Sequence, residues 1–231
     1  MTAASRLGRV REAIEAAARE AGRDPATVRL VAIGKTFPPE AIEEVHREGQ
    51  RDFGENRVQE AVTKARVLPP DIRWHLVGHL QANKAAPAAG LFSMIQSIDS
   101  LKIARRLDRL AGEVGRDLDG LVQVDLAGES TKHGAMPEEL RPLLEEARSF
   151  ERLRIRGLML LPPYEPDPED VRPWFRRIRE LAADLERDGL LGGNAPVELS
   201  MGMSHDFRVA VQEGATIVRI GTAIFGAREP A

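Results

Sequence analysis

The chain has 231 residues, of which 30% are charged, with a net charge of −3 and no cysteine. The length suits one domain over residues 1–231, because barrels of alternating strands and helices typically need roughly 250 residues. The lack of cysteine excludes disulfides, cysteine-ligated zinc and thiol catalysis, and the scattered basic residues argue against nucleic-acid or membrane partners. Since no apolar run could span a bilayer and the N-terminus lacks the apolar core of a signal peptide, we expect a cytoplasmic protein.

The N-terminal segment carries a helical pattern. Within residues 5–21, Leu7, Val10 and Ile14 fall on one stripe, and Gly22 ends the pattern. This helix precedes the repeating part of the chain, so we expect it to be an addition to the main fold.

Eight short apolar segments follow, and most of the gaps between them hold a helical pattern. They cover residues 28–34, 51–53, 72–78, 92–98, 121–126, 155–161, 197–201 and 216–220. Nearly continuous apolar runs such as LVAIG and RGLMLL imply burial on both faces, as in parallel sheets covered by helices. Eight such units favour an α/β fold of one closed (β/α)8 TIM barrel. The second segment is short, so an open doubly wound sheet stays as the alternative.

The last two strands each lead into a turn of small polar residues. Ser204 follows the seventh strand and begins a helix, and Gly221 and Thr222 follow the eighth. Backbone N–H groups in such turns bind anions, and the loops after the seventh and eighth strands of these barrels often hold phosphate. Either turn alone is explained by helix capping, whereas both together make a phosphate site an equal alternative.

Two basic residues lie where the first and eighth strands end. Because side chains alternate along a strand, Lys35 and Arg219 can point into the same barrel mouth. Apolar walls and a second cation would ease deprotonation of the lysine, which Schiff-base formation with an aldehyde requires. The alternative is that Lys35 pairs with a barrel carboxylate such as Asp125 or Glu198.

Arg219 lies inside an apolar strand, and a buried guanidinium needs a partner. A phosphate at the two C-terminal turns and an aldehyde at Lys35 would place a heteroaromatic ring between them. Its ring nitrogen could then accept a hydrogen bond from Arg219. This combination describes pyridoxal 5′-phosphate (PLP).

Several sequence motifs along the chain add to this evidence. They are AIGKTFP around Lys35, FGENRVQE at 53–60, WHLVGHLQANK at 74–84, GESTKHG at 128–134, RGLMLLPP at 156–163, and LSMGMSHDF with VRIGTAIFG near the end. On these motifs the chain resembles, from about residue 5 to 226, the pyridoxal phosphate homeostasis protein family. These are small single-domain proteins related to the barrel domain of alanine racemase.

The resemblance implies a barrel like the alanine racemase N-terminal domain, with an extra N-terminal helix and PLP in aldimine linkage to Lys35. The implied cofactor-binding residues are Lys35, Asn56, Met201, Ser204, Arg219, Gly221 and Thr222. Among them, Ser204, Gly221 and Thr222 would hold the phosphate, Arg219 would face the ring nitrogen, and Asn56 and Met201 would lie close to the ring. The chain departs from the family at Gly34, where Ser is commoner, and at Arg57, where Tyr is commoner.

The same residues favour a PLP carrier over an enzyme. In related alanine racemases, the acid or base opposite the lysine is a tyrosine from an added β domain of the second chain. We expect no such domain here, and Tyr164, the only tyrosine, falls in a loop after the sixth strand. Arg219 would also disfavour protonation of the ring nitrogen. We therefore expect no catalytic residue. A racemase-like PLP enzyme is the alternative, and a phosphosugar-binding barrel would leave Lys35, Asn56 and Arg219 together unexplained.

A PLP carrier would make transient contacts with apoenzymes, and we expect a monomer. Lys132 could transfer PLP by transimination, although a surface-loop role is the stronger interpretation. We assign no chemistry to His75, His79 or Lys84, and we expect no metal site. For both histidines, packing or hydrogen bonding is favoured over metal binding.

Overall fold

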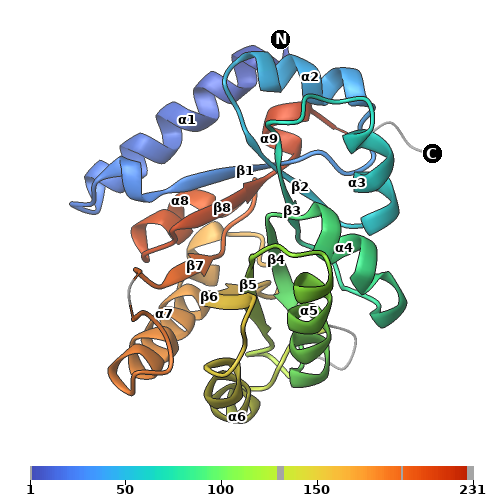
Figure 1. Ribbon diagram of the computed structural model, residues 1–231. Helices are drawn as coiled ribbons and strands as arrows, with labels where there is room; N and C mark the ends of the chain where they lie inside the picture. Colours follow the sequence, from blue (N-terminus) through green and yellow to red (C-terminus); the bar gives the residue numbers. More distant parts are fainter. Residues whose placement is uncertain (1, 129–132, 194, 228–231) are drawn as a thin grey trace.

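Eight parallel strands close into a barrel in sequence order (Figure 1). The computed structural model describes residues 2–128, 133–193 and 195–227. The strands are β1 (Arg29–Ile33), β2 (Asp52–Glu55), β3 (Arg73–Leu76), β4 (Met94–Ile98), β5 (Leu118–Val124), β6 (Leu153–Leu160), β7 (Glu198–Ser200) and β8 (Ile217–Ile220). Because β1 pairs in parallel with both β2 and β8, the predicted closed barrel is confirmed and the open sheet is excluded.

Helices cover the outside of the barrel (Figure 1). They are α1 (Ala3–Glu20), α2 (Pro39–Arg47), α3 (Val58–Ala65), α4 (Ala85–Leu91), α5 (Leu101–Glu113), α6 (Pro137–Ala147), α7 (Arg172–Arg187), α8 (Phe207–Gln212) and α9 (Thr222–Phe225). Short 3-10 turns occur at Pro25–Thr27, Ala82–Lys84 and Pro168–Val171. In the part of the chain that the structure describes, no helix is both long and apolar enough to cross a bilayer.

The predicted N-terminal helix is confirmed as α1, which the Thr2 hydroxyl caps at Ser5 N. Its buried stripe includes Leu7, Val10 and Ile14. The helix packs against α2, α8 and α9, so it supports the segments that begin and end the barrel.

Alternation along the strands separates two apolar cores. On β1, Leu30 and Ala32 face the helices, whereas Val31 and Ile33 face the barrel axis. The inner apolar core consists of Val31, Ile33, Val77, Met94, Leu121, Met159 and Ile217. Buried polar side chains occupy other parts of the barrel, and they lead to the functional site.

Candidate functional site

A cavity of about 280 Å³ lies at the carboxyl ends of β1 and β8. It is lined by Ile33, Lys35, Asn56, Val77, Leu161, Met203, Ser204, His205, Arg219, Gly221 and Thr222. Six of the seven residues predicted to hold a cofactor are therefore brought together. This is the end of the barrel at which enzymes with this fold place their active sites.

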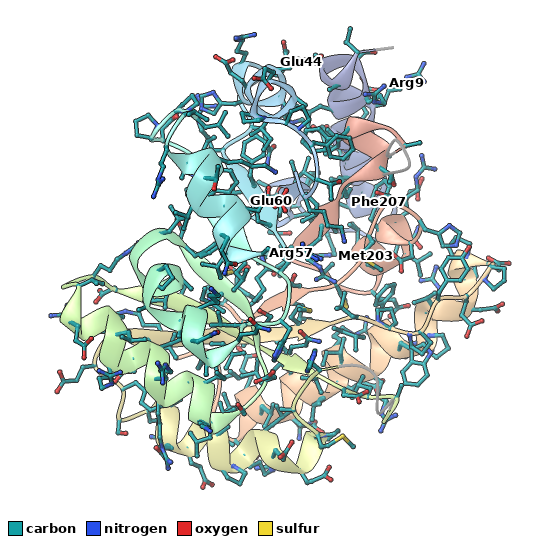
Figure 2. The ribbon with its side chains drawn as sticks, turned by 90° about the vertical axis from the view of Figure 1, so that its right-hand side faces the viewer. Arg9, Glu44, Arg57, Glu60, Met203 and Phe207 are labelled. Atoms are coloured by element: carbon teal, nitrogen blue, oxygen red, sulfur yellow. The ribbon has the colours of Figure 1, made fainter. Side chains whose placement is uncertain are left out.

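The seventh predicted residue, Met201, does not line this cavity. It is completely buried in the core between strands and helices. Met203, two residues further along, lines the cavity instead, on the β7–α8 side of the molecule (Figure 2). The sequence interpretation also assigned no cofactor role to Leu161 and His205, although they lie in the motifs RGLMLLPP and LSMGMSHDF.

The backbone around Lys35 is held by a bridge of charged side chains. Lys64 Nζ donates to Gly34 O at 2.9 Å, and Thr36 N donates to Glu60 Oε1 at 2.6 Å. Thr36 has a φ of 68°, a left-handed conformation that is unusual for a β-branched residue. Such strain persists only where surrounding contacts enforce it, and it concentrates at functional sites. The lysine is thus presented from a constrained segment.

Lys64 also joins two carboxylates behind this segment. Its Nζ lies 2.7 Å from Glu55 Oε1 and 2.8 Å from Glu60 Oε1. Burial raises the pKa of Glu55 to about 7, and the hydrogen bond from Lys64 and the charges of Lys64 and Lys35 only partly oppose this effect. Among the described residues, Glu55 Oε2 has no hydrogen-bond partner. Burial therefore favours the neutral form of Glu55, whereas Lys64 favours the charged form.

Neither carboxylate named from sequence as a partner of Lys35 is shown in that role. Glu198 pairs with Arg29 at 3.1 Å, at the start of β1 and roughly 20 Å along the strand from Lys35, so this alternative is wrong. Asp125 Oδ1 accepts from the backbone N–H groups of Ala127 and Gly128.

The two predicted phosphate turns lie against each other. Ser204 Oγ accepts from the N–H groups of Gly221 and Ala223, both at 3.3 Å. Gly202, which makes the first turn, has a φ of 92°, and a Cβ there would lie 2.5 Å from Ala210 Cβ. Only glycine suits that position. The hydroxyl and the two N–H groups form a small polar cradle beside the cavity.

Contacts from α1 and from the segment after β1 hold α9 in place. Arg6 Nε donates to Ile224 O at 2.6 Å, and Arg6 Nη2 donates to Phe225 O at 3.0 Å. The Phe225 ring stacks on Phe37, with centroids 5.0 Å apart. Since Phe37 follows Lys35 closely in the chain, this stacking couples the lysine segment to the polar cradle.

Arg219 lies in the cavity wall, only 4% exposed. Its Nη1 donates to Ser200 Oγ at 2.6 Å and its Nη2 to Leu160 O at 2.9 Å. Desolvation lowers the pKa of Arg219 to about 10, and the charge of Asp206 opposes this effect. The guanidinium remains charged at neutral pH, with the partners that its burial requires.

A chain of polar side chains continues from Ser200 through the barrel. Ser200 Oγ donates to Gln96 Oε1 at 2.7 Å, and Gln96 Nε2 lies 3.0 Å from His75 Nδ1. His75 Nε2 is 2.9 Å from Asp52 Oδ1, and Arg73 binds both oxygens of Asp52. Because the Gln96 amide donates, His75 Nδ1 accepts and its Nε2–H donates to Asp52.

This row of hydrogen-bonded side chains gives His75 a hydrogen-bonding role, as the sequence favoured. Burial would raise the pKa of Asp52, but the hydrogen bonds from Arg73 and His75 outweigh it and hold that pKa below its usual range. The chain therefore has an ionised end at Asp52 and a cationic end at Arg219. Through Ser200, these hydrogen-bonded side chains fix the orientation of the Arg219 guanidinium.

Comparison with known proteins shows that this barrel is of the alanine racemase N-terminal domain type. Residues 5–229 match the family model "Alanine racemase, N-terminal domain". Alanine racemase of Clostridium difficile 630 shares the fold, with a TM-score of 0.72 over 96% of this chain and 57% of its own, at 13% identity.

Closer relatives define the family. The pyridoxal phosphate homeostasis protein of Aquifex aeolicus is 44% identical over 99% of this chain and 100% of its own length. That of Pseudomonas aeruginosa is 44% identical over 99% of this chain and 96% of its own. The structure of PipY from Synechococcus elongatus PCC7942 with PLP bound has a TM-score of 0.85 and 41% identity, covering 97% of this chain and 100% of that one. The chain belongs to the pyridoxal phosphate homeostasis protein family.

Proposed function

We propose that this chain binds PLP in the cavity at the carboxyl ends of β1 and β8 and serves to buffer or supply it within the cell. The main support is that Lys35, Arg219 and the Ser204 cradle line one cavity of about 280 Å³. The relative from Synechococcus elongatus, whose structure contains PLP, supports the assignment.

The residues present fit the chemical parts of PLP. The hydroxyl groups of Ser204 and Thr222 offer donors for a phosphate, and the Gly221 N–H, which donates to Ser204 Oγ at a long 3.3 Å, would be shared with it. Arg219 offers a fixed donor for the ring nitrogen. When bound, PLP supplies an aldehyde with which a lysine amine can react reversibly, and among the described residues Lys35 is the lysine that lines the cavity.

The same wall argues for holding PLP without extensive catalysis. The buried Arg219 guanidinium disfavours a proton on the ring nitrogen, which weakens the ring as an electron sink. Tyr164, the only tyrosine, has 77% of its surface exposed and does not line the cavity. The carrier function also includes transient contacts with apoenzymes, with the chain acting as a monomer. Lys132, the suggested transfer residue, lies outside the described residues.

One observation favours a second candidate, a racemase-like enzyme. His205 lines the cavity, and its Nε2 lies 3.1 Å from Glu165 O. The His205 ring also contacts Tyr164, with centroids 5.4 Å apart. An imidazole at this position could move a proton to or from a bound amino acid.

Two assays on the purified chain separate these functions. A carrier loaded with PLP activates an apo-aminotransferase, and the Lys35→Ala variant loses this transfer while Lys84→Ala keeps it. Chiral analysis after incubation with L-amino acids would then show that the D-enantiomer forms no faster than it does with free PLP. Enzyme-like racemisation that is lost in His205→Gln would establish the second candidate instead.

A further inference from the structure

A cluster of metal-ligating side chains lies at the same end of the barrel as the PLP cavity but does not line it. His79 follows β3, Asp99 follows β4, and His133 precedes α6. Each offers a ligand atom, and these atoms all lie within 4.8 Å of one another. We propose that His79, Asp99 and His133 bind one divalent transition-metal ion of the zinc or cobalt type.

The side chains are already gathered around one point. His79 Nδ1 lies 3.0 Å from Asp99 Oδ2, and the rings of His79 and His133 stack with centroids 3.6 Å apart. Ligands of a tetrahedral zinc ion, at about 2.0–2.1 Å from it, are separated by about 3.3 Å. Both imidazoles are exposed, so rotations about their side-chain bonds can close the remaining distance and turn the stacked rings toward a shared ion.

Neighbouring groups orient the ligands. Ser100 Oγ donates to Asp99 Oδ1 at 3.0 Å, which leaves Oδ2 as the oxygen facing His79. Ser100 also caps α5, so the carboxylate is fixed at a helix start. Gln123 Nε2 donates to the carbonyl of His133. Such outer contacts are typical of metal sites, where they restrict the ligands to productive orientations.

The donor set indicates the kind of ion. Two imidazoles and one carboxylate suit zinc, cobalt or nickel, whereas calcium and magnesium prefer oxygen ligands alone. Three protein ligands leave a coordination position for water or an anion. His79 also borders a separate hollow lined by Arg57 and Lys84. Because these two cations oppose a further positive charge, we expect micromolar rather than nanomolar affinity.

The competing explanation is that the hydrogen bond and ring stacking satisfy the three side chains without an ion. Titration of the whole chain with cobalt chloride, followed by visible absorption, distinguishes the two, and zinc chloride calorimetry gives the affinity. We expect one ion per chain, with affinity at least tenfold lower in His133→Ala, His79→Ala and Asp99→Asn. His46→Gln is the matched control, since His46 pairs with Asp71 elsewhere, and it should bind as the parent does.

The inference is overturned if the parent shows no saturable binding at micromolar metal, or if His133→Ala binds as tightly as the parent. PLP binding is measured on the same variants, with and without metal. Because none of the three ligands lines the PLP cavity, we expect PLP binding to persist in all of them. A failure of the metal site is thereby distinguishable from a failure of the proposed function.

Discussion

Replacement of Glu55 by Gln tests the buried charge cluster that supports Lys35. Gln keeps the size of the side chain and an oxygen that can accept from Lys64, but it does not titrate. Burial raises the pKa of Glu55 from its ordinary 4.5 to about 7. The folded chain therefore binds more protons at this site than the unfolded chain between these two values. The stability that Glu55 contributes is fully present below pH 4.5 and is lost as the pH rises through 7.

The size of the effect follows from the same two values. Each pH unit corresponds to about 1.4 kcal/mol, so the folding free energy contributed by Glu55 falls by about 3–4 kcal/mol across this window of about 2.5 units. The Gln variant lacks this dependence. The stability of the parent relative to Glu55→Gln should thus decrease with rising pH and level off above pH 7.

Urea unfolding of both chains without PLP, from about pH 5 to about pH 8, measures this difference. Glu60→Gln is the control from the same cluster. Although partial burial raises the pKa of Glu60, the hydrogen bonds from Lys64 and Thr36 outweigh it and lower that pKa overall. The contribution of Glu60 is present above its ordinary pKa of 4.5 and lost below it, so its own titration adds no slope in the measured range; because the charge of Glu60 raises the pKa of Glu55, Glu60→Gln should lessen the parent's dependence on pH without abolishing it. A parent-minus-Glu55→Gln difference that is constant, or that grows with pH, would refute the reasoning.

Three further substitutions probe the cavity and the residues that support its walls. Gly78→Ala would place a Cβ 2.3 Å from Asn56 O, so we expect urea unfolding to show a loss of about 1–3 kcal/mol, and an unchanged midpoint would contradict this packing. Ser204→Ala removes one of the groups proposed to bind the phosphate, so equilibrium dialysis should show PLP affinity about tenfold lower, whereas unchanged affinity would remove Ser204 from the site. Gln96→Leu interrupts the polar chain behind Arg219, with an expected loss of about 1–3 kcal/mol and an altered absorption spectrum of bound PLP. Lower stability with an unaltered spectrum would limit Gln96 to a structural role.

The apolar runs predicted the barrel because most strands are buried on both faces. The predictions were least accurate where the inward residues are polar. On β2, Phe53 packs in the outer core while Asp52 is a buried polar residue, so the apolar run there is too short to set the strand's limits. β5 begins at Leu118, before the predicted start at 121, because Asp119 and Gly120 interrupt its apolar pattern.

The site was predicted where function follows from position on a strand. Lys35 and Arg219 could be placed at one mouth from alternation alone. The hydrogen-bonded side chains through Gln96 could not be predicted, because Gln96 and Ser200 are 104 residues apart and meet only when the barrel closes. Met201 was expected near the ring only because of the family resemblance, and the structure buries its side chain in the core between the strands and the helices.

We propose that Lys35 is the lysine that holds PLP. The most direct measurement is to incubate the chain with PLP, reduce the attachment with borohydride, and locate the added mass on peptides. If Lys35 holds PLP, the mass lies on the peptide containing Lys35 and the Lys35→Ala variant remains unlabelled. A label on a different lysine in the parent, or equal labelling of the variant, would contradict it.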